Sequence, residues 1–303
     1  MSQKAKTMPD RPFYIVDVFA EQRYAGNQLA VIRHADGLTS AAMQRIALEM
    51  NYSETTFIMR DELRDGGVDV RIFTAETELP FAGHPTLGTA YIINHEILPT
   101  PQTDLLLNMQ AGQIPVQFAD DGVIWMRQNP PTFGATFDHA AFAAAIGVPL
   151  DAVDTRFPVQ IVSTGLPFTI AALKTLDAVK SIKVNWAAFN TLIGQHVSGD
   201  ALDGLMVFAP ETYQLENTLN ARVVFDVQTM PEDPATGSAN GCLAGYLSHH
   251  HYFGDDRVDC RVEQGYEIKR PSLLLLRAHA DGDTVAVNVG GRVFMVARGT
   301  LLG

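Results

Sequence analysis

Short apolar runs separated by polar turns make up the first part of the chain. The runs are rich in β-branched and aromatic residues, a composition typical of strands. The exception is a predicted helix over residues 38–51. Thr39 or Ser40 can cap its first turn. Its apolar face would consist of Ala42, Ile46 and Met50. The strands expected in this part are residues 13–19, 29–33, 53–60, 68–74, 105–110, 114–119 and 123–128.

A longer apolar segment, FAGHPTLGTAYIINH at residues 81–95, departs from this strand pattern. Its period changes after the glycines and the proline, which predicts a loop that leads into a buried helix. The second part of the chain repeats the plan, with a helix near residues 185–197 and a Gly-rich loop and apolar helix after residue 232. The strands expected there are residues 157–165, 167–173, 205–210, 221–227, 261–268, 272–280, 284–291 and 292–299.

The two parts also align weakly in sequence, because one shift of the chain places Gly83 on Ser238 and Tyr91 on Tyr246. A chance alignment of two Ala/Gly-rich helix starts is the alternative. The shared order of elements favours a repeat. We therefore predict an α+β fold of two pseudo-symmetric domains, each a sheet or barrel wrapped around a central helix.

The predicted boundary lies in QNPPTFG, where two prolines and a glycine end a strand. This gives domains of residues 12–128 and 129–303. The last strand is free to return and pack on the first half.

The net charge of −12 and the pI near 5.1 restrict the partners of the chain. Such a field repels polyanions, and no cluster of Lys and Arg interrupts it, so we expect no nucleic-acid partner. Apolar runs are far shorter than the roughly 20 residues of a bilayer span, and the first residues lack the apolar core of a signal peptide. We expect no membrane contact and a cytoplasmic location.

The two cysteines, Cys242 and Cys260, lack the spacing of a zinc site. We expect reduced thiols, with a pairing left open by the sequence. The tract HHH at residues 249–251 follows the second apolar helix. Adjacent side chains at a helix end point in different directions, and the helix dipole favours histidines there, so we expect no metal.

The Gly-rich segments FAGHPTLG, residues 81–88, and DPATGSANG, residues 233–241, each lie between a strand and a helix. Backbone amides at a helix start favour an anion, so two facing starts would hold a small carboxylated metabolite between the domains. Ordinary turn chemistry is the alternative for either segment alone. Neither fits a nucleotide-binding pattern.

Three titratable residues near these segments are candidates for proton chemistry. His84 and Asp233 lie at the two helix starts, where a packed or capping histidine and a turn-forming acid are the alternatives. Glu54 lies between a predicted helix and a strand. It is either a solvated surface acid or a partly desolvated one, whose pKa would then rise toward the range of a general base. Asn27 fits a turn beside Gly26 and is also a candidate for the cleft.

Four segments together resemble the PhzF-like (phenazine biosynthesis-like) family, within the diaminopimelate epimerase-type fold. They are VDVFAEQRYAGNQLAVI, NYSETTF, ELPFAGHPTLGTA and EDPATGSANGCLAGYL. The resemblance covers nearly the whole chain. Gln28 stands where the family commonly has proline, which affects the loop more than the chemistry.

The resemblance implies an isomerase without a cofactor, in which Glu54 takes a proton from one carbon of the substrate and returns it to another. His84, Asp233 and Ser238 match residues that line the same pocket. Relatives that racemise amino acids carry two opposed cysteines where this chain has Gly83 and Ser238. Cys242 lies one helical turn beyond Ser238, which argues against a two-thiol racemase.

We therefore expect an isomerase that moves a proton, and so a double bond, within a small carboxylated molecule. The alternatives are a racemase or epimerase of the amino-acid type and a non-catalytic metabolite-binding protein. The resemblance also suggests a homodimer. The residues expected to bind the substrate are Gly83, Thr236, Gly237, Ser238, Ala239 and Asn27.

Overall fold

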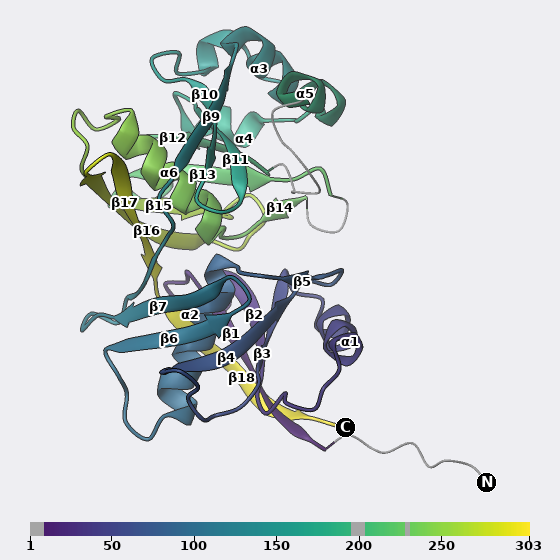
Figure 1. Cartoon of the computed structure of the whole chain (residues 1–303). Coiled ribbons are helices and arrows are strands. Elements are labelled where there is room, and N and C mark those ends of the chain that lie inside the picture. Colours follow the sequence, from purple (N-terminus) through teal and green to yellow (C-terminus); the bar gives the residue numbers. More distant parts are fainter. Residues whose placement is uncertain (1–8, 195–203, 228–230) are drawn as a thin grey trace.

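The computed structural model describes residues 9–194, 204–227 and 231–303. Its elements form two bodies (Figure 1). The first body, the lower one in the figure, holds the first strands of the chain and one strand from its end. Its elements are β1 (Arg11–Val18), β2 (Asn27–Ile32), α1 (Ser40–Met50), β3 (Glu54–Ile58), β4 (Gly67–Phe73), β5 (Glu78–Leu79), α2 (Gly83–Ile92), a π-helical turn (Ile93–Ile97), β6 (Asp104–Met109), β7 (Gly112–Phe118), β8 (Ile124–Arg127) and β18 (Val293–Leu301).

The second body consists of the elements between β8 and β18. They are β9 (Thr132–Phe137), α3 (His139–Ile146), a 3₁₀ turn (Leu150–Ala152), β10 (Val159–Ser163), β11 (Pro167–Ala172), α4 (Leu176–Ser181), α5 (Trp186–Ile193), β12 (Gly204–Ala209), β13 (Leu219–Val224), β14 (Glu232–Asp233), α6 (Gly237–His249), β15 (Val258–Gln264), β16 (Ser272–Asp281) and β17 (Thr284–Gly291).

Strand pairing follows the same plan in both bodies. In the first, β2 is parallel to β3 across α1, and β4 is parallel to β6 across α2. In the second, β11 is parallel to β12 across α4 and α5, and β13 is parallel to β15 across α6. The remaining pairs inside each body are antiparallel. The predicted α+β fold with two similar halves is confirmed.

Matching ion pairs mark the repeat. Arg71 on β4 donates to Glu78 on β5, and Arg222 on β13 donates to Glu232 on β14. By these strands and by the helix starts, Gly83 corresponds to Gly237. The sequence alignment, which followed the two tyrosines, was one residue off in pairing Gly83 with Ser238.

The bodies are joined by one strand pair and by the chain itself, which returns from β17 to the first body as β18. β18 runs antiparallel beside β1 along its whole length, and Figure 1 shows this yellow strand within the lower body. β8 pairs with β17, which links the two sheets edge to edge. β18 therefore has the position beside β1 that β9 has beside β10 in the second body.

Helices α2 and α6 are the cores of the two bodies. Nearly every residue of α2 and of α6 is buried, because both sequences are apolar or small on all faces and carry no charge in their first turns. The other helices cover the outside of the sheets. α1 begins with the predicted Thr39 cap, whose hydroxyl accepts from the amide of Ala42.

Several local expectations were wrong. The buried face of α1 is Ala42, Met43 and Ala47, with Ile46 and Met50 only partly buried. β9, α3 and α4 were not predicted, although Asp138 caps α3 and Gly147 ends it in a left-handed conformation. The strand expected at residues 261–268 begins and ends earlier, at Val258 and Gln264. The helix expected near 185–197 ends at Ile193, and residues 195–197 lie outside the described part of the chain.

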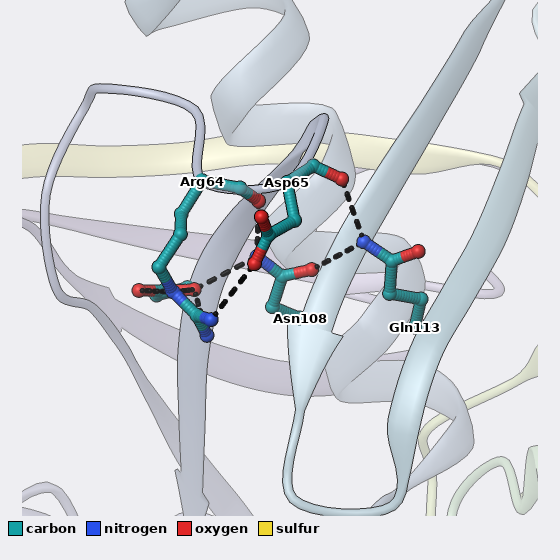
Figure 2. Close-up of polar contacts among 5 residues, drawn as sticks. Arg64, Asp65, Asn108 and Gln113 are labelled. Carbon is teal, nitrogen blue, oxygen red and sulfur yellow. Dashed lines mark hydrogen bonds and ion pairs between the residues drawn. The ribbon is translucent and has the colours of Figure 1, made fainter.

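The predicted turn between β3 and β4 is held by side chains rather than by its backbone alone (Figure 2). Arg64 forms ion pairs with Asp65 and Asp69. From the neighbouring hairpin, Asn108 donates to the carbonyl of Arg64 and Gln113 donates to the carbonyl of Asp65. This network joins the turn to β6 and β7.

None of the described helices has the length and hydropathy that a bilayer crossing requires.

The packing of α2 against the sheet predicts the effect of Gly88→Ala. The added Cβ would lie 2.6 Å from Leu29 Cδ2 and 2.8 Å from Val18 Cγ2. In an open helix this change stabilises by up to about 1 kcal/mol. Here we expect a loss of about 1–3 kcal/mol from overpacking, measured by urea unfolding. A variant at least as stable as the wild type would contradict this packing.

Candidate active site

The N-termini of α2 and α6 meet where the two bodies face each other. A Cβ atom on Gly83 would lie 3.0 Å from the Cα atom of Gly237, and one on Gly237 would lie 3.3 Å from the Cα atom of Gly83. Both distances are tighter than most Cβ contacts in proteins, so the two glycines favour this close approach. The N-cap residues, Ala82 and Thr236, form no side-chain capping bond. The first amides of both helices are therefore available to an anion.

Glu54, the first residue of β3, lies at this junction. Its Oε2 atom is 3.4 Å from Nε2 of His84, the second residue of α2. Neither atom has a hydrogen-bond partner among the described residues. The Glu54 side chain is 15% exposed and that of His84 is 5% exposed. The two groups thus face each other in a space that is largely shielded from solvent.

Burial dominates the proton affinity of both groups. Desolvation, and then the nearby Asp233, raise the pKa of Glu54 from 4.5 to about 8. Desolvation lowers the pKa of His84 from 6.5 to about 3, against a smaller opposing effect of a hydrogen bond with the backbone of Gln28. Near neutral pH, most Glu54 is protonated and His84 is uncharged. Their contact is therefore not an ion pair at this pH.

Asn27 connects the two helix starts. Its Nδ2 atom donates to Asp233 Oδ1 at 2.8 Å and to the carbonyl of Ala235 at 3.1 Å, and it lies 3.3 Å from Nδ1 of His84. Asn27 is the first residue of β2, whereas Asp233 and Ala235 precede α6. One amide group from the first body thus contacts both halves of the site.

Asp233 accepts two further hydrogen bonds. Thr236 donates through Oγ1 at 2.6 Å, and Ser53 donates through Oγ at 3.4 Å. Desolvation raises the pKa of Asp233, although its bonds from Thr236, Asn27 and Ser53 act in the opposite direction. The carboxylate is therefore buried but held by neutral donors.

The structure places the candidate residues from the sequence in one region. Glu54, His84, Asp233 and Asn27 are in contact, and Gly83, Thr236, Gly237, Ser238 and Ala239 form the helix starts beside them. Glu232, next to Asp233, instead pairs with Arg222. A surface groove of about 1170 Å³ lies elsewhere, between β6, β7, β8 and the β16–β17 hairpin, and no candidate residue lines it.

Sequence reasoning missed Gln264, which is buried behind Asp233. Gln264 donates to the carbonyl of Asp233 at 2.8 Å and to Thr236 Oγ1 at 3.0 Å, and it accepts from the side chain of Asn240. It ends β15, many residues after the loop that it contacts. The sequence offered no clear signal, because β15 already carries Asp259, Arg261 and Glu263, and one more polar residue at its end does not stand out.

The histidine tract and the cysteines have other contacts. His249 stacks on Phe133 with ring centroids 4.0 Å apart, and His250 hydrogen-bonds with Gln160. Cys242 and Cys260 are buried free thiols, and Sγ of Cys242 faces Thr164. Among the described residues, no three His, Cys, Asp or Glu side chains are grouped to hold a metal.

Two sheets wrapped around central helices, with acid–base groups where the helix starts meet, define the diaminopimelate epimerase-type fold. A hydroxyproline epimerase from Agrobacterium vitis shares the fold, with a TM-score of 0.62 at 10% identity over 99% of this chain and 93% of that one. The chain belongs to the phenazine biosynthesis-like family, whose model matches residues 16–299. It is an isomerase, as predicted, which excludes the alternative of a non-catalytic binding protein.

Two similar proteins and one solved structure support this assignment. A trans-2,3-dihydro-3-hydroxyanthranilate isomerase from Pseudomonas fluorescens is 34% identical, over 96% of this chain and 99% of the relative. An uncharacterized isomerase from Mesorhizobium japonicum is 32% identical, over 97% of this chain and 99% of the relative. The structure of a PhzF-family phenazine biosynthesis protein from Bacillus anthracis has a TM-score of 0.87 at 26% identity, covering 98% of this chain and 100% of that one.

The raised pKa of Glu54 predicts how Glu54→Gln changes stability with pH. Between about pH 4.5 and pH 8 the unfolded chain releases a proton that folded Glu54 retains. Wild-type stability therefore carries a contribution from Glu54 that falls as pH rises through this window, and the glutamine has no such contribution. We expect the stability of the variant, relative to the wild type, to increase with pH in urea unfolding.

Glu76→Gln, on an exposed turn, controls for the loss of a surface carboxylate. A difference between Glu54→Gln and the wild type that stays constant with pH would show that Glu54 is not desolvated as described.

Proposed function

We propose that this isomerase moves a proton, and with it a double bond, within a small carboxylated substrate, and that Glu54 is both the general base and the general acid. The observation that carries this proposal is the Oε2 atom of Glu54, which is buried, unpartnered among the described residues and directed at the junction of two helix N-termini. A pKa of about 8 suits a carboxyl group that must both accept and return a proton.

The neighbouring residues have supporting roles in this proposal. The amides at Gly83, Gly237, Ser238 and Ala239, with Thr236 and Asn27, bind the substrate carboxylate and stabilise charge that develops on the conjugated substrate. His84 is uncharged near neutral pH, so it can hold or pass a proton beside Glu54. Asp233 holds Asn27 and Thr236 in place and borders the same pocket.

This mechanism requires no cofactor and no metal, because one carboxyl group performs both proton transfers. A two-thiol racemase is disfavoured. Gly83 and Ser238 carry no thiol, and Sγ of Cys242 is turned toward Thr164 and the carbonyl of Leu166. From the family resemblance we also propose a homodimer that works in the cytoplasm, with domains of residues 12–128 and 129–303, the last strand returning to pack on the first domain.

The first compound to test is trans-2,3-dihydro-3-hydroxyanthranilate, which the name of the Pseudomonas fluorescens relative gives as its substrate. It has the carboxylate that the helix starts would bind. A role of this chain in phenazine biosynthesis is a separate question, since the walls of the pocket outside the shared motifs decide which carbon skeleton fits.

Glu54→Gln should abolish proton transfer and leave binding intact, because it keeps the shape of the side chain and removes the base. With trans-2,3-dihydro-3-hydroxyanthranilate in D₂O, we expect a loss of roughly 10²–10⁴-fold in kcat and of deuterium incorporation, followed by NMR. Calorimetry should give a Kd close to that of the wild-type protein. Glu76→Gln serves as the matched control, and turnover by Glu54→Gln at the wild-type rate would refute the mechanism.

The pH profile offers an independent test. A base with a pKa of about 8 is ionised in only a minority of free enzyme at pH 7. We therefore expect kcat/KM to rise with pH and to level off above about pH 8. A profile that is flat between pH 6 and about pH 9 would contradict Glu54 as the base.

A further inference from the structure

The turn between β15 and β16 touches both halves of the candidate site without contributing a residue to it. The turn is closed by hydrogen bonds from the amide of Arg270 to the carbonyl of Gly265 and from the amide of Lys269 to the carbonyl of Tyr266. Gly265 has a φ of +78°, and a Cβ atom there would lie 2.6 Å from the carbonyl oxygen of Pro234. The turn therefore packs directly on the loop that carries Asp233.

Gln264 fixes the start of this turn to that loop. Its Nε2 group donates to the carbonyl of Asp233 and to Thr236 Oγ1, and its Oε1 atom accepts from the amide of Thr236 and from Asn240 Nδ2. Since Thr236 Oγ1 accepts from Gln264, its own hydrogen is directed to Asp233 Oδ2. Gln264, where β15 ends and the turn begins, thus fixes the position of the Asp233 carboxyl group through Thr236.

Arg270, at the other end of the turn, forms hydrogen bonds with residues of the first body. Its Nε atom donates to the carbonyl of Gly26 at 2.9 Å, and one terminal nitrogen donates to the carbonyl of Ala25 and to Asp17 Oδ1, both at 2.7 Å. The second oxygen of Asp17 accepts from the amide of Tyr24 at 2.6 Å. The Asp17 side chain is 2% exposed, so this ion pair is largely withdrawn from water.

The segment that Arg270 holds leads directly into Asn27. The amide of Gly26 donates to the carbonyl of Pro271, so the segment is attached to the turn through its backbone as well. Gly26 has a φ of +70°, and a Cβ atom there would lie 2.4 Å from the carbonyl oxygen of Val18. The chain before Asn27 therefore has little freedom to move while Arg270 is in place.

We propose that Arg270 is a positioning residue of the isomerase. It fixes Asn27 of the first body relative to Asp233 of the second, because one short turn binds the segment before Asn27 through Arg270 and the Asp233 loop through Gln264. Asn27 in turn contacts His84, which faces Glu54. This inference rests on the proposed function for its consequence in catalysis, but the geometry that it describes can be tested without a substrate.

Arg270→Lys is the informative variant. Lysine keeps the positive charge beside Asp17 but lacks the planar group that donates to two carbonyls and a carboxylate at once. The control is Arg33→Lys, at the opposite end of β2 from Asn27. Arg33 also forms an ion pair with a carboxylate, donating two hydrogen bonds to Asp61 where Arg270 donates one to Asp17, and its side chain is 21% exposed against 20% for Arg270. Asp17→Asn is a second, milder change to the same contact.

The substrate-free measurement is the ¹⁵N NMR signal of the His84 ring in the full-length protein, identified by its absence in His84→Gln. We expect Arg270→Lys to shift the ring signals and to move the titration of His84 from about pH 3 toward its ordinary value, as water reaches a loosened site. Asp17→Asn should do the same to a smaller extent, and Arg33→Lys should leave the signals unchanged.

The kinetic measurement uses trans-2,3-dihydro-3-hydroxyanthranilate. We expect Arg270→Lys to lower kcat by roughly 10- to 100-fold with little change in KM, because misplaced groups slow the chemical step. If wild-type protein does not convert the compound, the proposed function fails for that substrate, and the His84 signals still decide on Arg270. The positioning role is overturned if Arg270→Lys loses stability in urea to the same extent as Arg33→Lys and keeps the wild-type His84 signals.

Discussion

Gly83 and Gly237 lie against each other at the point where two buried helices begin, and the rest of the site depends on that contact. A Cβ atom at either position would make a tight contact with the other helix, so glycine at both positions favours this approach. The approach brings two sets of uncapped amides to one place and aligns the positive ends of two helix dipoles. Each half alone would offer an ordinary helix start, whereas together they bring two uncapped helix starts to one place, which is the anion site proposed above.

Burial then gives the ionisable groups around this contact their chemical character. Loss of water keeps a proton on Glu54 near neutral pH and keeps His84 uncharged. The same burial would be unfavourable for Asp233 without its neutral donors. The site therefore combines an acid ready to exchange a proton with an acid held by hydrogen bonds, and the difference between them comes from their surroundings rather than from residue type.

The local motifs of the chain were readable in sequence because they change its pattern over a few residues. Glycines and a proline before an apolar run predicted both helix starts, and with them the surroundings of His84 and Asp233. The contact of Glu54 with His84 was not readable, since it depends on how β3 lies beside α2. Gln264 and Arg270 were missed for the same reason, because their partners are far away in the chain. The strand β9 was missed because two prolines directly precede it and a glycine lies within it.

The pairing of β18 with β1 has a consequence for how the protein forms. β1 pairs with β2 on one side, and its other neighbour, β18, follows all the other described strands in the chain. The first body therefore cannot complete its sheet until β18 has been synthesised, although its central helix and most of its strands are present much earlier. The two halves look like repeats, but the sheet of the first body is incomplete without β18, so a fragment ending after β8 would expose the unpaired edge of β1 to aggregation.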